Sequence, residues 1–263
     1  MRIDHIIFAV ADRDEAGADF GRLGFKAVIG GTHADGNTHN RLCVLADGVY
    51  LELCAPTDKA SLNVQHEDNG KNWLYVYNAG EGYAGYAILT DDVDPVEARL
   101  RARGYPINDQ KGSGRVLPDG REMKGKSVTI LGKRYPAIVQ DISPRVWRAP
   151  SENGETEHPN GVTGVQQVIA LVCDLEEGAR RHEDLLGVAP QPGSYVEGAK
   201  TADFPVDGAL ITIAAPADTT SAVYQEVTKR GEVPYLIRLK TTMPERRGLL
   251  DLNTTHLARI ELV

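Results

Sequence analysis

The sequence predicts an α+β protein of two halves, each built from paired strand–helix–strand–strand–strand (βαβββ) modules. Two observations lead to this prediction. An internal repeat relates the N-terminal part of the chain to the C-terminal part, and a segment rich in Pro, Gly, Ser and acidic residues separates them. A single unit of about 50 residues cannot bury its own sheet, so the modules must pair and form curved sheets with a cup-shaped face.

The repeat is visible in two pairs of segments. Residues 3–16 (IDHIIFAVADRDEA) align with residues 165–178 (VQQVIALVCDLEEG), and their apolar positions coincide. Residues 48–56 (GVYLELCAP) align with residues 208–216 (GALITIAAP) at nearly the same offset. Because two separate matches share one spacing, each copy is interpreted as a strand, a helix and further strands that end in a buried one.

The helices of the repeat have their own sequence signals. EAGADFGRLGF and EEGARRHEDLLGV begin with acidic residues, carry apolar residues at helical spacing and stop at a glycine. A fainter copy begins at residues 83–105 and continues with expected strands at 127–131 and 136–140. In the last copy, residues 234–242 and 256–263 predict strands. The stretch that follows the first of these strands is short for a helix, so we expect this copy to be truncated.

These patterns divide the chain into three parts. An N-terminal half of two modules is expected over residues 1–141, followed by a linker over residues 142–160. A C-terminal half of one complete and one truncated module is expected over residues 161–263.

Composition narrows the classes of partner. The chain of 263 residues has 29 Lys and Arg against 37 Asp and Glu, and a net charge of -8 gives no electrostatic basis for binding nucleic acid or an anionic membrane. No apolar run is long enough to cross a membrane, and the N-terminus does not resemble a signal peptide. Cys43, Cys54 and Cys173 are expected to be buried, reduced thiols, which favours a cytoplasmic location.

Four segments carry a resemblance to a known superfamily: DHIIFAVAD, GGTHADGNTHNRL, YLELCAP and HPNGVTGVQQVIALVCDL. Together they resemble the vicinal oxygen chelate superfamily, and most closely its glyoxalase-like branch. That superfamily includes glyoxalase I, bleomycin-resistance proteins and extradiol dioxygenases, so the resemblance implies a fold but leaves several activities open. Metal ligands in the superfamily typically sit on the first and last strands of a module, which here correspond to His5 and Glu52.

The resemblance therefore implies a divalent metal ion, Zn, Ni, Mn or Fe, held by His5 and Glu52. An imidazole and a carboxylate suit all four metals. His39 lies in the apparent third strand and is the expected third ligand, and Glu52 and His39 are the expected catalytic residues. In the repeat, Gln167 and Thr212 occupy the positions equivalent to His5 and Glu52, so the C-terminal half is not expected to hold a metal of its own.

Structural interpretations of the same residues stay open. On residue type alone, His5 is a core histidine that donates to a backbone carbonyl. Glu52 could be a buried carboxylate paired with Arg41 or Arg238. His33 could swing over the cup from its glycine-rich loop, although a solvated position is the more common one for such a residue. His182 is expected on an exposed helical face.

Four further residues are expected to contact the substrate. LPDGREMKGK predicts a hairpin with an Asp-Gly turn, and a comparable segment rims the pocket in the glyoxalase-like branch. Arg115 and Arg121 are therefore expected to meet an anionic or carbonyl group, although a solvated basic loop is an equal alternative. Tyr86 lies near the first-strand position of the faint copy, and Asn40 follows His39.

The expected function is that of a small-molecule enzyme that chelates adjacent substrate oxygens on a divalent metal and transfers a proton beside a carbonyl group, as an isomerase or lyase. Glu52, or a carboxylate displaced from the metal, would be the general base. A metal-free protein that binds a small molecule and an Fe(II) extradiol-type dioxygenase are the alternatives; the dioxygenase is weaker because the resemblance would place its ligands in the second half. A homodimer is the default expectation, since edge strands near residues 127–140 or at the C-terminus could pair between chains.

Overall fold

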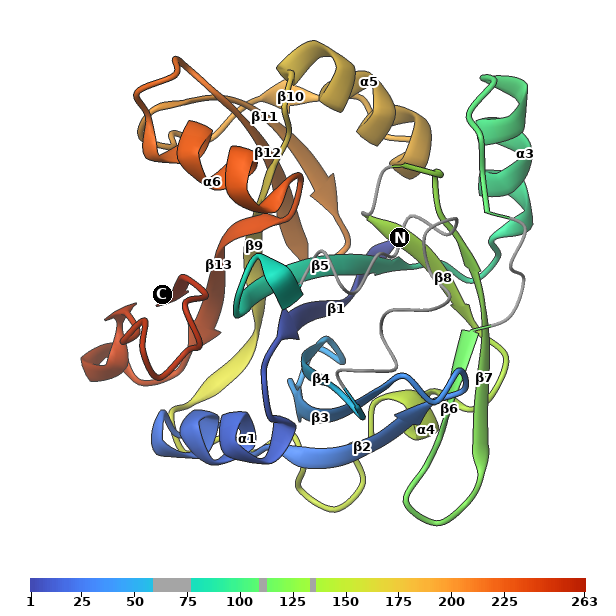
Figure 1. The fold of residues 1–263 in the computed structure, drawn as a ribbon, viewed down its shortest axis with the longest axis vertical. Coiled ribbons are helices and arrows are strands. Elements are labelled where there is room, and N and C mark those ends of the chain that lie inside the picture. Colours follow the sequence, from blue (N-terminus) through green and yellow to red (C-terminus); the bar gives the residue numbers. More distant parts are fainter. Residues whose placement is uncertain (59–76, 109–112, 133–135) are drawn as a thin grey trace.

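The computed structural model describes residues 1–58, 77–108, 113–132 and 136–263. Its N-terminal half contains, in chain order (Figure 1), β1 (Arg2–Ala9), α1 (Arg13–Arg22), β2 (Val28–His33), β3 (Thr38–Val44), β4 (Tyr50–Pro56), β5 (Gly82–Leu89), α3 (Asp94–Ala102), β6 (Ser113–Val116), β7 (Glu122–Val128) and β8 (Ala137–Asp141). These strands form a closed barrel in the order β1-β4-β3-β2-β6-β7-β8-β5. Two successive βαβββ modules therefore build one barrel.

The C-terminal half forms an open sheet in the order β10-β11-β12-β9-β13-β15-β14. Its elements are β9 (Val162–Leu171), α5 (Leu175–Leu186), β10 (Gln191–Pro192), β11 (Ala199–Val206), β12 (Ala209–Pro216), α6 (Ala222–Arg230), β13 (Pro234–Thr241), the 3-10 helix η2 (Pro244–Arg246), β14 (Gly248–Leu249) and β15 (Ile260–Leu262). The predicted α+β fold of paired modules is confirmed. In the last module, η2 stands where the other modules have a longer helix.

Strand pairing confirms the internal repeat. In the barrel, β1 runs parallel to β4 with His5 opposite Tyr50 and Ile7 opposite Glu52. In the open sheet, β9 runs parallel to β12 with the same relation, so that Ile169 lies opposite Thr212. Gln167 and Thr212 thus occupy the positions in the second sheet that His5 and Glu52 occupy in the first.

The helix starts follow the acidic signals in the sequence. The Asp12 carboxylate accepts hydrogen bonds from two backbone N–H groups of the first turn of α1, and Asp174 caps α5 in a similar way. Helix α5 ends at Gly187, whose φ of 70° lies in the left-handed region. None of the described helices is long and apolar enough to cross a membrane.

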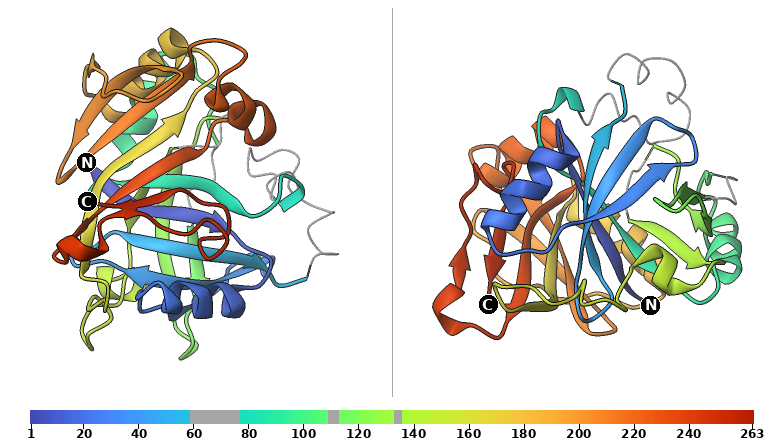
Figure 2. Two further views of the ribbon diagram at one scale, coloured as in Figure 1. Left: turned by 90° about the vertical axis from the view of Figure 1, so that its left-hand side faces the viewer. Right: turned by 90° about the horizontal axis from the view of Figure 1, so that it is seen from below.

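The main hydrophobic core lies between the barrel and the open sheet, which pack side by side (Figure 2). Ile6, Leu51 and Tyr86 point from the barrel wall into this core, where they join Val168 and Ile211 of the open sheet. Because alternate residues of a strand point to opposite faces, the same barrel strands present their other residues to the barrel interior.

The segment between the two halves packs against the barrel. It contains α4 (Arg145–Arg148), and the Arg148 side chain is buried. Farther along, the His158 ring lies 2.9 Å from the carbonyl oxygen of Val44 and accepts a hydrogen bond from the backbone N–H of Lys26. The expected linker is therefore fixed to the barrel along part of its length.

Two local expectations were wrong. Residues 256–263 do not form one strand, because His256 and Leu257 have φ angles of 53° and 65° and the strand begins only at Ile260. The segment near residues 127–140 offers no free edge for a dimer, because the strands described there, β7 and β8, each pair with a neighbouring strand on both sides in the closed barrel. The dimer itself stays a prediction.

Candidate metal and substrate site in the barrel

The barrel interior gathers polar residues from five strands. Glu52 of β4 lies opposite Leu42 of β3, and Asn40 lies opposite Cys54, so all four side chains share the interior face. Glu52 and Asn40 are almost completely buried, and the Asn40 side-chain N–H donates to Glu52. Carboxylates are seldom buried without a partner, so this position indicates a special role for Glu52.

A β-bulge turns two consecutive residues of β1 inward. Pairing between β1 and β5 shifts between Ile3 and His5, and this shift leaves Asp4 as the extra residue. As a result, both Asp4 and His5 face the interior, and His5 Nδ1 lies 2.6 Å from an Asp4 oxygen. The His5 ring also stacks on Tyr50, with ring centroids 4.8 Å apart.

A second bulge brings His33 to the same place. The register between β2 and β3 shifts at the glycine pair, where Ile29 lies opposite Arg41 and Gly31 opposite Asn40. His33 therefore shares the face of Asn40, and its Nδ1 atom lies 2.6 Å from the Thr38 hydroxyl. The bulge requires glycine, since a Cβ at Gly30 would collide with the Asn40 side chain.

The two imidazoles approach the two oxygens of one carboxylate. His5 Nε2 lies 3.5 Å from Oε2 of Glu52, and His33 Nε2 lies 3.2 Å from Oε1. Burial alone would raise the pKa of Glu52, but the hydrogen bond and charge of His33 and the charge of His5 hold that pKa well below its ordinary value. Glu52 is therefore ionised at neutral pH.

Asp4 is held ionised by its neighbours. Burial would raise its pKa, but the hydrogen bond to His5 and the charges of Arg148 and Arg145 keep the Asp4 pKa well below its ordinary value. Arg145 donates to Asp4, and both arginines also pair with Asp141. Because an ionised Asp4 can only accept, His5 carries its proton on Nδ1 when neutral, and Nε2 is left with a lone pair.

Cys54 lies beside this cluster. Among the described residues, His33, Glu52 and Cys54 offer ligand atoms that all lie within 4.8 Å of one another. Burial, together with the Glu52 charge, raises the pKa of the Cys54 thiol well above its ordinary value. The thiol is therefore protonated in the absence of a metal ion, and an ion bound at this sulfur would have to displace that proton.

The donor set fits a divalent metal. Two imidazole nitrogens each lie within 3.5 Å of one carboxylate, and Zn, Ni, Mn and Fe(II) all accept this combination of donors. Ligating histidines usually donate their second N–H to an outer acceptor, and Asp4 serves His5 in this way while the Thr38 hydroxyl can serve His33. The buried Asn40 Oδ1 has no hydrogen-bond partner among the described residues, so this oxygen keeps its capacity to accept a hydrogen bond.

The structure brings together four of the predicted site residues and places the others elsewhere. His5, Glu52, Asn40 and Arg115 face the interior of the barrel. His39 does not, because it alternates with Asn40 and lies on the face that Arg41 turns toward α1, where Arg41 pairs with Asp14. This position does not favour the expected ligand and catalytic role of His39, which stays a prediction, whereas the His33 ring lies beside Glu52.

Tyr86 and Arg121 also lie outside the site. Tyr86 is opposite Ile6 in the β1–β5 pair and so faces the open sheet, where its hydroxyl lies 3.0 Å from Nε2 of His182. His182 is buried, not exposed as expected, and burial lowers its pKa to about 4. Arg121 follows the Asp-Gly turn of the predicted hairpin; it pairs with exposed Asp119 and lies over the Trp147 ring.

The open sheet has a different polar arrangement at the equivalent positions. The Gln167 amide donates to Thr212, and the Thr212 hydroxyl donates to Asp203. Arg238 closes the chain by donating to both Gln167 and Glu261. Neither expected arginine partner binds Glu52, since Arg41 pairs with Asp14 and Arg238 with Glu261.

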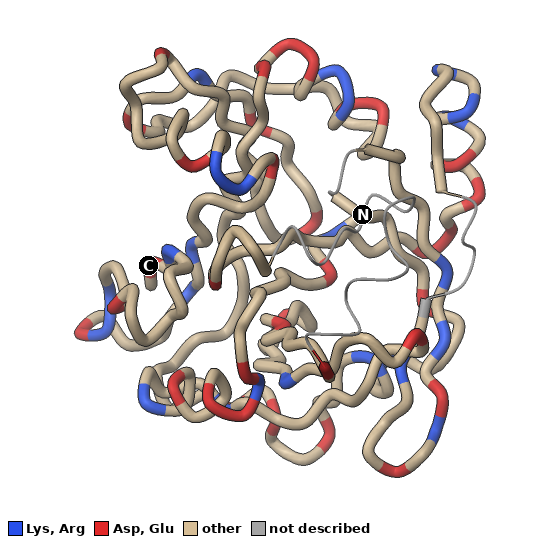
Figure 3. Tube along the Cα trace, viewed as in Figure 1, with Lys and Arg blue, Asp and Glu red and all other residues tan. Residues whose placement is uncertain are grey.

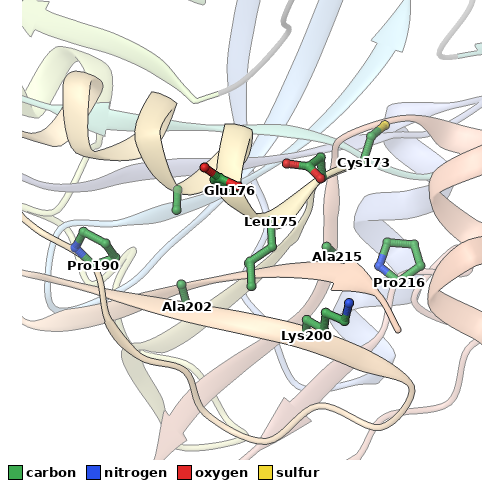
Figure 4. Close-up of a pocket in the computed structure, with 10 residues that line it drawn as sticks. Cys173, Leu175, Glu176, Pro190, Lys200, Ala202, Ala215 and Pro216 are labelled. Atoms are coloured by element: carbon green, nitrogen blue, oxygen red, sulfur yellow. The ribbon is translucent and has the colours of Figure 1, made fainter. Parts of the chain in front are cut away.

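A separate surface hollow lies outside the barrel, at the start of α5. It has a volume of about 440 Å³ and includes Cys173, Leu175 and Lys200 in its lining (Figure 4). Cys173 is exposed, which corrects the expectation of three buried thiols, whereas Cys43 and Cys54 are buried.

Acidic and basic residues are intermixed along both halves of the described chain (Figure 3).

Comparison with known proteins agrees with the architecture. The glyoxalase-like domain family matches residues 3–172 of the chain. The chain belongs to this family. The glyoxalase-like protein is thereby a member of the vicinal oxygen chelate superfamily, as the four sequence segments predicted. No curated protein matches its sequence.

Two solved structures share the fold of the glyoxalase-like protein over most of its length. One is a hypothetical protein from Staphylococcus aureus, with a TM-score of 0.73 and 12% identity over 100% of this chain and 99% of that chain. The other is a mutant 4-hydroxymandelate synthase from Streptomyces coelicolor, with a TM-score of 0.66 and 16% identity over 95% of this chain and 76% of that chain. At such identities the likeness concerns the fold alone.

Proposed function

We propose that the protein is a metal-dependent enzyme that binds a divalent ion with Glu52, His5 and His33. The observation that carries this proposal is that two imidazole Nε2 atoms face the two oxygens of one buried carboxylate, at 3.5 and 3.2 Å. An ion seated between them would be bound by neutral imidazoles and an ionised carboxylate, as such ligands require. An ion at His33 Nε2 would leave the ring proton on Nδ1, and this N–H group can donate a hydrogen bond to the Thr38 hydroxyl oxygen.

The proposed reaction is proton transfer beside a carbonyl group in a small molecule with adjacent oxygens. When bound, the metal would polarise those oxygens and stabilise the negative charge that develops on them. Glu52 would take the proton as the general base, since it is ionised and lies beside the proposed ion.

The surrounding residues orient the site. Asp4 fixes the tautomer of His5, and α4 neutralises Asp4 through Arg145 and Arg148. The Tyr50 ring stacks on the His5 ring. Burial raises the pKa of the Tyr50 phenol, so Tyr50 stays protonated and can donate but not abstract a proton. Because Glu52 and His5 are largely buried, their electrostatic interactions are only weakly screened by solvent.

The test is titration of metal-stripped, tag-free protein with Co²⁺, followed by its visible absorption spectrum. We expect uptake of about one ion per chain, without a sulfur-to-cobalt charge-transfer band because the proposed ligands are nitrogen and oxygen atoms. Strong charge-transfer absorption would instead make Cys54 a ligand in place of His5. Exchange of the α-proton of small carbonyl compounds into D₂O, followed by NMR, tests the reaction.

Two other outcomes would identify the alternative functions. If Co²⁺, Zn²⁺, Ni²⁺, Mn²⁺ and Fe²⁺ all fail to bind, the metal proposal is wrong and a metal-free binding protein becomes the better interpretation. If the Fe²⁺-loaded protein consumes oxygen in the presence of catechols, it is a ring-cleaving dioxygenase rather than an isomerase or lyase.

A further inference from the structure

Arg115 differs from every other buried arginine that the structure describes. Four such arginines are at least nine-tenths buried, and three of them pair with carboxylates. These pairs are Arg148 with Asp141, Arg181 with Glu177 and Glu232, and Arg230 with Glu226. Arg115 has no ion pair with a described residue, although burying a charge without a partner is costly.

The contacts of Arg115 leave part of its guanidinium unused. One terminal nitrogen donates to the backbone carbonyls of Trp147 and Arg148, which anchors the group beside α4. The Nε atom is buried and has no hydrogen-bond partner among the described residues. The Nε–H group of Arg115 is therefore available to donate to a carboxylate, which is a preferred partner of guanidinium groups.

The position of Arg115 links it to the proposed metal site. Strands β2 and β6 pair with His33 opposite Arg115, so both side chains enter the barrel from neighbouring strands. The unpartnered oxygen of Asn40 lies in the same interior, beside Glu52. The His33 side chain is 28% exposed, so the cluster can be reached from solvent.

The charges of this region favour an anionic ligand. Among the described residues inside the barrel or at its α4 end, three carboxylates balance three guanidinium groups: Asp4, Glu52 and Asp141 against Arg115, Arg145 and Arg148. A divalent ion would leave this region with two excess positive charges. A ligand with negative charge would compensate them in an interior where the attraction is weakly screened.

We propose that Arg115 binds a carboxylate of the substrate, so that the substrate is a small organic acid with a carbonyl or hydroxyl oxygen close to its carboxylate. This inference rests on the proposed function, because the metal would bind the adjacent oxygens while Arg115 receives the acid group. It names the class of substrate that the metal site alone leaves open.

The experiment compares oxalate with its neutral analogue oxamide on Co²⁺-loaded protein, with perturbation of the cobalt spectrum as the measure of binding. Arg115→Gln keeps an N–H donor for the α4 carbonyls but removes the charge, and Arg115→Lys keeps the charge without the fork. We expect Arg115→Gln to weaken oxalate binding by about 10- to 100-fold, as for loss of a charged hydrogen-bonding partner, and to leave oxamide unaffected. Arg121→Gln, on the exposed side of the same hairpin, is the matched control and should behave as wild type.

A second measurement separates this inference from the metal proposal. In metal-free wild-type protein, oxalate but not oxamide should shift the NMR resonance of the Arg115 Nε–H group, which is identified by its absence from Arg115→Gln. Failure to take up Co²⁺ would overturn the metal proposal but not this assignment. Equal binding of oxalate by wild type and Arg115→Gln, or an unmoved Nε–H resonance, would overturn the assignment.

Discussion

The barrel and the open sheet place different chemistry at equivalent positions of one repeated scaffold. In the barrel, His5 and Glu52 face each other, and the carboxylate is approached by a second imidazole from His33. In the open sheet, the equivalent Gln167 and Thr212 are hydrogen-bonded to each other. The two sheets share strand pairing and differ in the side chains that the strands present.

The comparison shows what converts a structural polar network into a candidate site. In the open sheet, Gln167 donates to Thr212 and accepts from Arg238, so its amide already has both donor and acceptor partners. In the barrel, Asn40 Oδ1 and Arg115 Nε lack partners among the described residues. A buried network with open donors and acceptors is unfavourable on its own and is typical of a surface prepared for a ligand.

The largest predicted effect comes from Glu52. Glu52→Gln removes the charge that both imidazoles share, and we expect a loss of metal affinity beyond the roughly 10- to 100-fold that changes in the outer shell cause. Thr212→Val is the control at the equivalent position, and it should lower stability by about 1–3 kcal/mol through a lost buried hydrogen bond without affecting metal affinity. Calorimetric titration with Zn²⁺ measures the metal affinity of both variants, and urea unfolding measures the stability of Thr212→Val. Equal affinities in wild type and Glu52→Gln would refute the role of this carboxylate.

The second prediction distinguishes His33 from His39. His33→Ala should weaken metal binding by about 10-fold or more, because one of three protein ligands is lost. His39→Ala should leave affinity unchanged, since His39 lies on the outer face of the same hairpin. The opposite result would restore His39 as the third metal ligand.

The third prediction concerns His182, which joins the two regions through Tyr86. Burial lowers its pKa to about 4, so the folded protein holds a neutral ring that the unfolded chain would protonate below its ordinary value of 6.5. Stability should therefore be full above pH 6.5 and fall as the pH drops toward about 4, by a few kcal/mol at most. Urea unfolding of wild type and His182→Gln across this range measures the effect. A parallel pH dependence in both proteins would show that His182 is not its source.

The smallest predicted effect is a difference in chemical reactivity between the thiols of the two halves. Burial raises the pKa of Cys43 and Cys54 in the barrel, so both should resist modification, while exposed Cys173 should react. Titration of the native protein with a thiol reagent should therefore count one fast thiol, and Cys173→Ser should abolish it. A fast signal that persists in Cys173→Ser would mean that the barrel opens readily.

Sequence reasoning predicted the repeat from regularly spaced strands, and the resemblance to the superfamily implied the convergence of His5 with Glu52. It favoured a solvated position for His33 because the bulge at Gly30 shifts the alternation by one residue, and a one-residue shift changes which face a side chain occupies. The glycine pair in an expected strand was the available signal, since glycine within a strand often marks a bulge.

Other differences required the third dimension. Arg115 was expected to meet an anionic or carbonyl group or to lie in a solvated loop, and only the structure shows that its buried charge has no carboxylate partner among the described residues. Tyr86 was misplaced because its strand presents it on the face of Ile6, toward a second sheet whose docking the sequence does not specify. Asp4 went unnoticed because adjacent residues normally point to opposite faces, and the bulge in β1 overrides that rule.

The most direct measurement of the central claim is X-ray absorption spectroscopy of protein loaded with one equivalent of Zn²⁺. The proposed site predicts two imidazole nitrogens at about 2.0–2.1 Å together with carboxylate oxygen, and loss of one imidazole in His33→Ala. A coordination shell made only of oxygen, or one that His5→Ala and His33→Ala leave unchanged, would contradict it.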